Sequence, residues 1–224
     1  MRRRVLLSWS SGKDSAWALH VLRQRADLDV VGLFTTINEA AGRAAMHAVR
    51  RSLVERQAGA AGLPVDFIPL PHPCPNDAYE AAMHRHVAAA RARGVECVAF
   101  GDLLLEDVRR YREAQLAGSG VEPLFPLWAS DTAALARSMV EAGLRAHITC
   151  LDPARLPASF AGRLFDHSLL DSLPTGVDPC GENGEFHTFA CAGPMFRAPV
   201  PVTVGETVER DGFVFADLLD AAAD

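Results

Sequence analysis

The sequence predicts an α/β protein, in which a parallel sheet wrapped by helices is followed by a smaller α+β domain. Short apolar runs typical of buried strands alternate with helical patterns through the first half of the chain. Near the end, two alternating apolar runs flank Asp211-Gly212, a dipeptide typical of a tight hairpin turn. At 224 residues, the chain is long enough for two small domains that share a cleft.

The elements of the first half follow one another in strict alternation. Asn76 is the expected N-cap of the third helix, and Gly62 and Gly94 are the expected C-terminal stops of the second and third helices. We expect strands over residues 4–10, 28–37, 64–70 and 95–102, and helices over residues 14–26, 44–62, 76–94 and 106–120. This order indicates parallel strands joined by helical crossovers.

The pattern changes after residue 120. We expect a helix over residues 131–143, a strand over 144–151, a helix over 158–173 and the terminal hairpin. Prolines become more frequent near residues 123–126, so we place a domain boundary there. The expected domains cover residues 1–124 and residues 125–224.

The composition excludes several classes of protein. A formal net charge of -6 argues against a nucleic-acid or membrane surface, because both favour a basic face on the protein. The chain contains five cysteines, an odd number, and they are widely separated without a CxxC pair, which suggests neither a disulfide framework nor a zinc site. We therefore expect a cytoplasmic protein that binds neither nucleic acid nor membrane.

The loop within LLSWSSGKDSAWAL (residues 6–19) has the composition of an anion-binding site. A helix N-terminus at the carboxyl edge of a parallel sheet presents free N–H groups and a partial positive charge. Gly12 permits close backbone approach to an anion, and Lys13 adds a mobile positive charge. Hydroxyl donors come from Ser10, Ser11 and Ser15.

Two further observations bear on this loop. Lys13 is the only lysine among 22 basic residues, so a lysine would fall at this position by chance only about once in twenty-two times. The loop is too short for a Walker A motif, which needs four residues between its first glycine and the Gly-Lys pair. The alternative is a helix start that is merely capped by Asp14 or Ser11.

A second polar stretch is DPCGENGEFHTF (residues 178–189). Its proline and glycines prevent a regular helix, so the loop displays Glu182, Glu185 and His187, the last two on one face if extended. Two carboxylates and an imidazole near a bound phosphate could coordinate a divalent cation, hold an ammonium ion or accept a proton. The alternative is a solvated acidic loop with a hydrogen-bonded histidine.

Other candidates lie at the end of the fourth strand and in the next helix. Asp102 follows the strand at its carboxyl end, where it could orient a substrate or a metal ion. Arg109 and Arg112 suit an anionic substrate, or they belong to a solvated helix face. Cys180 is more consistent with a packed residue than with a nucleophile.

SSGKDS (residues 10–15) resembles the SGGKDS pyrophosphate loop of the N-type ATP pyrophosphatases, with Ser11 where that family usually has glycine. Further stretches are similar to the diphthine ammonia ligases, in their shorter bacterial branch. The similarity covers nearly the whole chain, and GENGEFHT is its most specific element. These stretches are MHAVRRSLVERQA (46–58), FGDLLLEDVRRYRE (100–113), PLW (126–128) and DPCGENGEFHTF (178–189).

The resemblance implies an ATP-dependent ligase that activates a carboxylate as an adenylate, releases pyrophosphate and lets ammonia displace AMP. It also implies a Rossmann-like sheet of HUP type with helices on both faces, which binds the nucleotide, and a smaller C-terminal domain that closes over the cleft. The implied cofactors are ATP and Mg²⁺. The implied partners are ammonium and a small or protein-borne carboxylate, and a homodimer is the candidate assembly.

The resemblance also suggests roles for individual residues. The expected nucleotide-binding residues are Ser8, Ser10, Ser11, Gly12, Lys13, Asp14, Ser15 and Thr35, with Asp14 as the Mg²⁺ ligand. The catalytic candidates are Lys13, Asp102, Glu182, Glu185 and His187. His47 and Arg50, one helical turn apart, either face the nucleotide or form a surface pair.

Two other functions stay open. Sulfur transfer to a nucleobase ordinarily needs a persulfide cysteine or a CxxC motif together with a basic RNA surface, and this chain lacks them. A non-catalytic adenine-nucleotide sensor would bind ATP and change conformation without releasing pyrophosphate.

Overall fold

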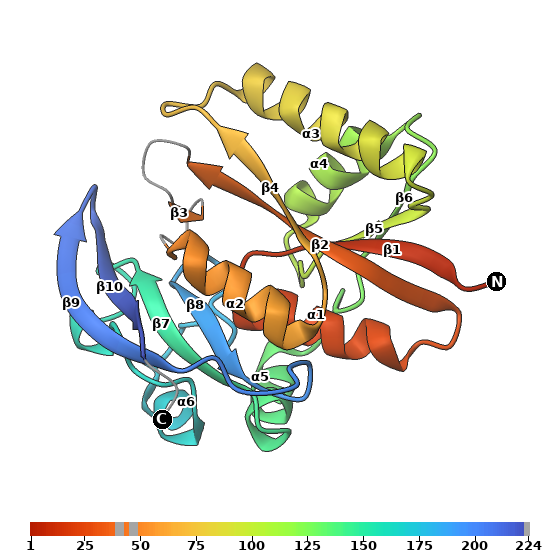
Figure 1. Cartoon of the computed structure of the whole chain (residues 1–224). Coiled ribbons are helices and arrows are strands. Elements are labelled where there is room, and N and C mark those ends of the chain that lie inside the picture. The colour runs from red at the N-terminus through yellow and green to blue at the C-terminus, as the bar shows by residue number, and fades with distance from the viewer. Residues whose placement is uncertain (39–42, 45–48, 222–224) are drawn as a thin grey trace.

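The computed structural model describes residues 1–38, 43–44 and 49–221, and these residues form two sheets (Figure 1). In the first sheet, parallel strands lie in the order β4-β2-β1-β5-β6, and the short β3 pairs antiparallel with β2. The strands are β1 (Arg3–Ser8), β2 (Leu28–Asn38), β3 (Arg43–Ala44), β4 (Val65–Leu70), β5 (Cys97–Ala99) and β6 (Glu122–Leu124). The predicted Rossmann-like class is confirmed.

Helices cover both faces of this sheet (Figure 1). They are α1 (Lys13–Gln24), α2 (Arg51–Ala61), α3 (Asn76–Ala92) and α4 (Glu106–Leu116). Side chains alternate along β1, so Leu7 packs in one apolar cluster with Leu19 of α1 and Leu53 of α2. Leu6 packs in a second cluster with Met83 of α3, on the opposite face. The crossovers therefore place α1 and α2 on one face and α3 on the other.

The second sheet is antiparallel, with the strand order β8-β7-β10-β9. Its elements are α5 (Thr132–Glu141), β7 (Arg145–Leu151), the 3-10 helix η1 (Ala158–Phe160), α6 (His167–Ser172), β8 (Phe186–Ala192), β9 (Val202–Arg210) and β10 (Phe213–Asp220). Asp211 and Gly212 adopt positive φ angles of 53° and 81°, as a two-residue turn between twisted strands requires. The predicted hairpin is confirmed.

The prediction of one continuous helix over residues 158–173 is wrong, because residues 161–166 are not helical. Gly162 has a φ of 77°, which ends the short 3-10 turn, and the following backbone runs beside β7 instead. The Ile148 N–H donates to the Arg163 carbonyl at 3.0 Å, and the Phe165 N–H donates to the Ala146 carbonyl at 2.7 Å. This segment thus satisfies backbone groups of β7 that a helix would have left unpaired.

Other predicted boundaries also need correction. The helix predicted from residue 44 begins at Arg51, since Arg43–Ala44 form β3; residues 45–48, with His47, lie outside the described residues. Asn76 is the first helical residue and not the N-cap, because its amide donates to Glu80 at 2.8 Å and Pro75 occupies the cap position. The helix predicted to residue 120 ends at Leu116, before two glycines with φ angles of 73°.

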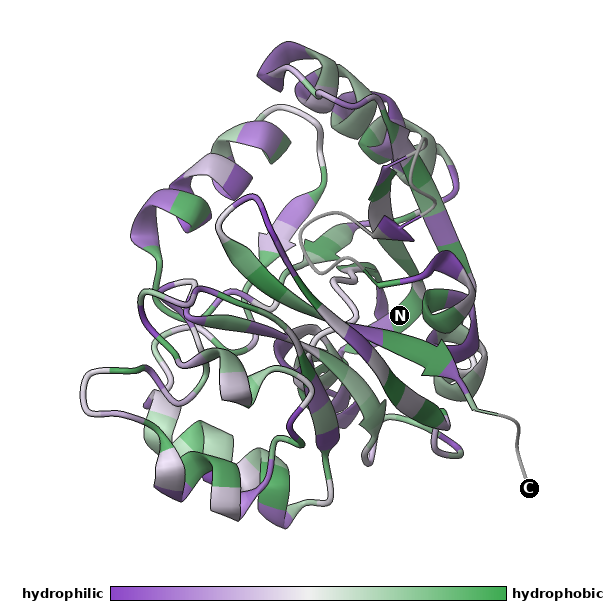
Figure 2. Ribbon diagram, turned by 90° about the vertical axis from the view of Figure 1, so that its left-hand side faces the viewer, coloured by the Kyte–Doolittle hydropathy of each residue, from purple (hydrophilic) through white to green (hydrophobic). Residues whose placement is uncertain are grey.

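Hydrophobic and hydrophilic residues are interspersed along both the strands and the helices (Figure 2). The larger apolar cluster is continuous between the two sheets, since it includes Leu7 of β1 and Phe189 of β8. Across the described part of the chain, no helix combines the length and the apolar composition that crossing a bilayer requires.

The fully buried Gln57 of α2 joins the two sheets. Its amide oxygen accepts from Trp9 Nε1 at 2.9 Å, and its amide nitrogen donates to the carbonyls of Ser11 at 2.9 Å and Ala190 at 2.6 Å. The Ala190 N–H also donates to the Ser11 carbonyl at 2.9 Å. The loop after β1 is therefore held between α2 and β8.

Replacing Gln57 by Leu should destabilise the protein by about 3 kcal/mol, because Trp9 Nε1 and the Ala190 carbonyl lose their hydrogen bonds to it while buried. The free energy of unfolding in urea measures this loss. Gln24→Leu, at an exposed position of α1, is the matched control and should change stability by less than about 0.5 kcal/mol. Equal effects of the two substitutions would contradict the role of Gln57.

Candidate active site

A cleft of about 1180 Å³ opens at the carboxyl ends of β1, β2 and β5. β1 lies between β2 and β5, so the chain crosses over in opposite directions on its two sides, which is where ligands bind in open α/β sheets. The predicted site residues that line this cleft are Ser8, Ser10, Lys13, Asp14, Ser15, Thr35, Asp102, Glu182 and His187. Its walls do not include Ser11, Gly12 or Glu185.

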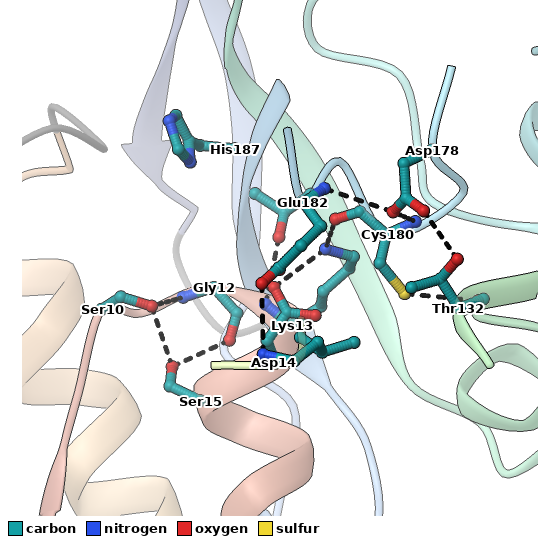
Figure 3. Close-up of polar contacts among 12 residues, drawn as sticks. Ser10, Gly12, Lys13, Asp14, Ser15, Thr132, Asp178, Cys180, Glu182 and His187 are labelled. Carbon is teal, nitrogen blue, oxygen red and sulfur yellow. Dashed lines mark hydrogen bonds and ion pairs between the residues drawn. The ribbon is translucent and has the colours of Figure 1, made fainter. Parts of the chain in front are cut away.

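The loop after β1 (residues 9–12) is shaped by hydroxyl groups of nearby serines (Figure 3). Ser10 Oγ accepts from the Gly12 N–H at 3.3 Å and lies 3.1 Å from Ser15 Oγ, which donates to the Gly12 carbonyl at 3.0 Å. Gly12 is the N-cap residue of α1, and no side chain caps the helix there. The alternative of a helix start capped by Asp14 or Ser11 is therefore wrong.

Ser11 occupies a strained position in this loop. Its φ is 69°, in the left-handed region that favours glycine, and its side chain is fully buried. Ser11 Oγ has no hydrogen-bond partner among the described residues, and Ser11 does not line the cleft. Its carbonyl, held by Gln57 and Ala190, fixes the loop instead.

Lys13 is almost completely buried, with an exposed fraction of 1%. Its ammonium group donates to Asp14 Oδ2 at 2.9 Å and to the Cys180 carbonyl, and it lies 5.6 Å and 5.3 Å from the ring centroids of Phe165 and Phe186. Burial alone would lower the pKa of Lys13, but the nearby charge of Asp14 leaves it raised. The positive charge of Lys13 is therefore held in one place at the floor of the cleft. The sequence predicted a mobile charge, and this prediction is wrong.

Asp14 lines the cleft. Its Oδ2 pairs with Lys13, whereas Oδ1 is buried and has no hydrogen-bond partner among the described residues. Burial raises the pKa of this carboxyl despite the charge of Lys13. Among the residues that the structure describes, no group of three or more His, Cys, Asp or Glu side chains is arranged to hold a metal ion. A Mg²⁺ ion at Asp14 would be held by one carboxylate oxygen together with phosphate oxygens and water, which is a common ligand set for Mg²⁺ in proteins.

The loop over residues 178–185 forms the opposite wall. Glu182 Oε1 accepts from the N–H groups of Leu103 and Leu104 at 3.1 and 3.2 Å, and burial raises the pKa of its carboxyl. Glu185 is 2% exposed and uses both oxygens within the loop, accepting from Asp178 N–H and from the backbone and side chain of Asn183. Glu182 thus reaches the cleft, whereas Glu185 shapes the loop.

His187 projects from β8 and lines the cleft (Figure 3). Burial, followed by the nearby charge of Lys13, lowers the pKa of His187 to about 4. The imidazole is therefore neutral at physiological pH. It could accept or donate a hydrogen bond to a ligand without adding charge.

Asp102 lies at the other end of the cleft, beside Arg112 of α4. The distance between Asp102 Oδ2 and Arg112 Nε is 3.5 Å. Burial raises the pKa of Asp102, although the Arg112 charge opposes this effect. Of the two arginines considered from the sequence, Arg112 lines the cleft, whereas Arg109 pairs with Glu113 at 2.8 Å. Arg50 pairs with Asp217 and does not line the cleft.

Several residues that organise the site could not be singled out from sequence patterns. Thr188 Oγ1 accepts from the Lys13 N–H at 3.0 Å, and the rings of Phe165 and Phe186 flank its ammonium group. Only their spatial convergence identifies them, although Phe186 and Thr188 belong to the GENGEFHT stretch. Cys180 contributes its carbonyl; burial raises the pKa of its thiol to about 12, which is consistent with a packed residue.

Comparisons with known proteins find similarity along most of the chain. Residues 1–122 match the model of the diphthamide synthase N-terminal domain, and residues 131–217 match that of the diphthamide synthase C-terminal domain. A diphthine–ammonia ligase of Danio rerio is 33% identical over 121 residues, which cover 50% of this chain and 47% of that protein. A Bos taurus protein of the same name is 27% identical over 161 residues, which cover 69% of this chain and 60% of that protein. The chain spans about half the length of the first of these relatives.

Ser11→Gly should be more stable than Ser11→Ala by about 1 kcal/mol, because both remove the unpaired hydroxyl but only glycine relieves the left-handed backbone. Thermal or urea unfolding of the two variants measures the difference. If Ser11→Ala were the more stable of the pair, the strain at this position would be refuted.

The low pKa of His187 predicts an acid-sensitive contribution to stability. The unfolded chain protonates this histidine near its ordinary pKa of 6.5, whereas the folded chain does so only near 4. Its stabilising effect is thus complete above pH 6.5 and is lost as the pH falls toward 4. Between pH 7 and pH 5, the unaltered chain should lose about 2 kcal/mol more than His187→Gln. His84→Gln, at an exposed position, is the control and should behave like the unaltered chain.

Proposed function

Because the chain belongs to the diphthamide synthase family, we propose that it is an ATP-dependent ligase that forms an amide from a carboxylate and ammonia, with release of AMP and pyrophosphate. The observation that carries this proposal is the fixed ammonium of Lys13 at the N-terminus of α1, on the floor of a large cleft. A helix N-terminus with a buried cation favours polyanions such as a triphosphate.

The residues present fit ATP and Mg²⁺. Ser10 and Ser15 would hold the phosphates next to Lys13, and the carboxylate of Asp14 would hold the metal ion. Bound Mg²⁺ would neutralise phosphate charge. Thr35 lines the cleft at the end of β2, on the uncharged side that suits a nucleoside.

Catalysis on this proposal depends mainly on positioning and charge. The acceptor carboxylate attacks the α-phosphorus of ATP, and Lys13 stabilises the negative charge of the departing pyrophosphate. Ammonia then attacks the activated carbonyl carbon, and AMP leaves. The carboxylates of Asp102 and Glu182, whose pKa values burial raises, line the cleft and are the candidates to accept the released proton.

The remaining parts of the proposal concern partners and place. The names of the relatives state diphthine and ammonia as reactants, and we extend ammonia to this chain. The acceptor is a small or protein-borne carboxylate, with no role for nucleic acid or membrane. Residues 1–124 bind the nucleotide and residues 125–224 close over it. We place the protein in the cytoplasm, with a homodimer as its candidate assembly.

The direct test is to incubate the protein with ATP, Mg²⁺ and ammonium, with and without a small-metabolite extract, and to identify the products. AMP and pyrophosphate are expected, and their release should stop when EDTA removes Mg²⁺. ADP with phosphate would contradict the proposal. Nucleotide binding without pyrophosphate release would indicate a sensor, and turnover that does not respond to ammonium would indicate another nucleophile.

Lys13→Met should reduce pyrophosphate release at least 100-fold, because it removes the charge that faces the leaving group. Circular dichroism and a thermal unfolding curve show whether the variant folds. Arg85→Met, at an exposed position of α3, is the control for loss of a positive charge and should keep the activity. Full turnover by a folded Lys13→Met variant would remove the phosphate role of this residue.

A further inference from the structure

The cleft has a second, charged wall that the nucleotide does not explain. On the side of β2 and β4, the lining residues Phe34, Thr35, Thr36 and Leu70 carry no charge. On the side of β5 and α4, the lining includes Asp102 and Arg112. The two ends of the cleft therefore suit different ligand groups.

Arg112 is held rigidly but incompletely bonded. Its guanidinium lies 4.8 Å from the ring centroid of Phe100, and Nη1 is 3.4 Å from the Tyr79 hydroxyl. Its Nε forms a long ion pair with Asp102 Oδ2 at 3.5 Å, and within the described part of the chain neither of these two atoms has a hydrogen-bond partner. The wall thus contains a preoriented cation whose pairing with Asp102 is weak.

A carboxylate would complete this arrangement. Arginine binds carboxylates with a planar fork of N–H donors, and a ligand carboxylate would supply the close hydrogen bonds that the long ion pair with Asp102 does not make. Around Arg112, the cleft is lined by the apolar groups of Tyr79, Met83, Leu105 and Val108. The matching ligand is therefore a carboxylate attached to an apolar carbon chain.

We infer that this wall is the acceptor subsite, in which Arg112 binds the carboxylate and the apolar residues hold its carbon chain. The inference rests on the proposed function, because only a ligase has an acceptor substrate. Binding of a carboxylate at Arg112 does not depend on turnover and is measured separately.

Arg109 provides a matched control on the same helix. Its Nε donates to Glu113 at 2.8 Å, and its guanidinium lies 5.0 and 4.7 Å from the ring centroids of Phe125 and Trp128. It has the same charge and the same kind of aromatic contact as Arg112, but it does not line the cleft.

The test uses hexanoate as the probe and hexanamide as its uncharged counterpart, with binding measured by calorimetry or by ligand-observed NMR. Hexanoate should bind saturably, and hexanamide at least tenfold more weakly. Arg112→Gln should weaken hexanoate binding at least tenfold, Arg112→Lys should restore part of it, and Arg109→Gln should change it less than twofold. Circular dichroism verifies that the variants fold.

Three results would overturn the inference: no saturable binding of hexanoate to the unaltered chain up to tens of millimolar, unchanged binding by a folded Arg112→Gln variant, or an equal loss in Arg109→Gln. The nucleotide assay separates this result from the fate of the proposed function. If the chain releases AMP but hexanoate binding does not depend on Arg112, only the acceptor subsite is refuted. If hexanoate binding depends on Arg112 but no AMP is released, only the ligase activity is refuted.

Discussion

The carbonyl oxygen of Ser11 accepts hydrogen bonds from the Ala190 N–H of β8 and from the Gln57 amide of α2. A third bond joins the loop to β8, from the Lys13 N–H to Thr188 Oγ1. These bonds fix the backbone of the loop over residues 9–12 at the place where it leaves β1. Because β8 belongs to the second sheet, the loop conformation depends on both sheets, and the first sheet by itself does not complete the site.

The same dependence governs the charge at the floor of the cleft. Removing an ammonium group from water is costly unless hydrogen bonds and an opposite charge replace the solvent. Asp14 supplies the charge from α1, but the Cys180 carbonyl and the rings of Phe165 and Phe186 come from the second half of the chain. Docking of the second half is therefore what permits Lys13 to be buried and still charged.

Local patterns in the sequence account for β1, β2, β4, β7 and the terminal hairpin, because each depends on neighbours within a few residues. They fail where a distant partner decides. Residues 163–165 have a helical pattern but pair with β7, and no local signal reveals that edge. Glu185 has the residue type of a catalytic acid, yet the N–H groups of its own loop claim both oxygens. Gln57 carries no pattern at all, since only the fold brings Trp9, Ser11 and Ala190 to it.

Asp14 Oδ1, Asp102 Oδ2 and Arg112 Nε are buried atoms without hydrogen-bond partners, and all three belong to residues that line one cleft. Folded proteins normally satisfy such groups, so each lowers the stability of the ligand-free chain. A ligand that satisfies them binds the folded state and not the unfolded one, and it therefore raises stability in proportion to the logarithm of its concentration above Kd. The free energy that these three atoms withhold from folding is thus available to a ligand that pairs with them.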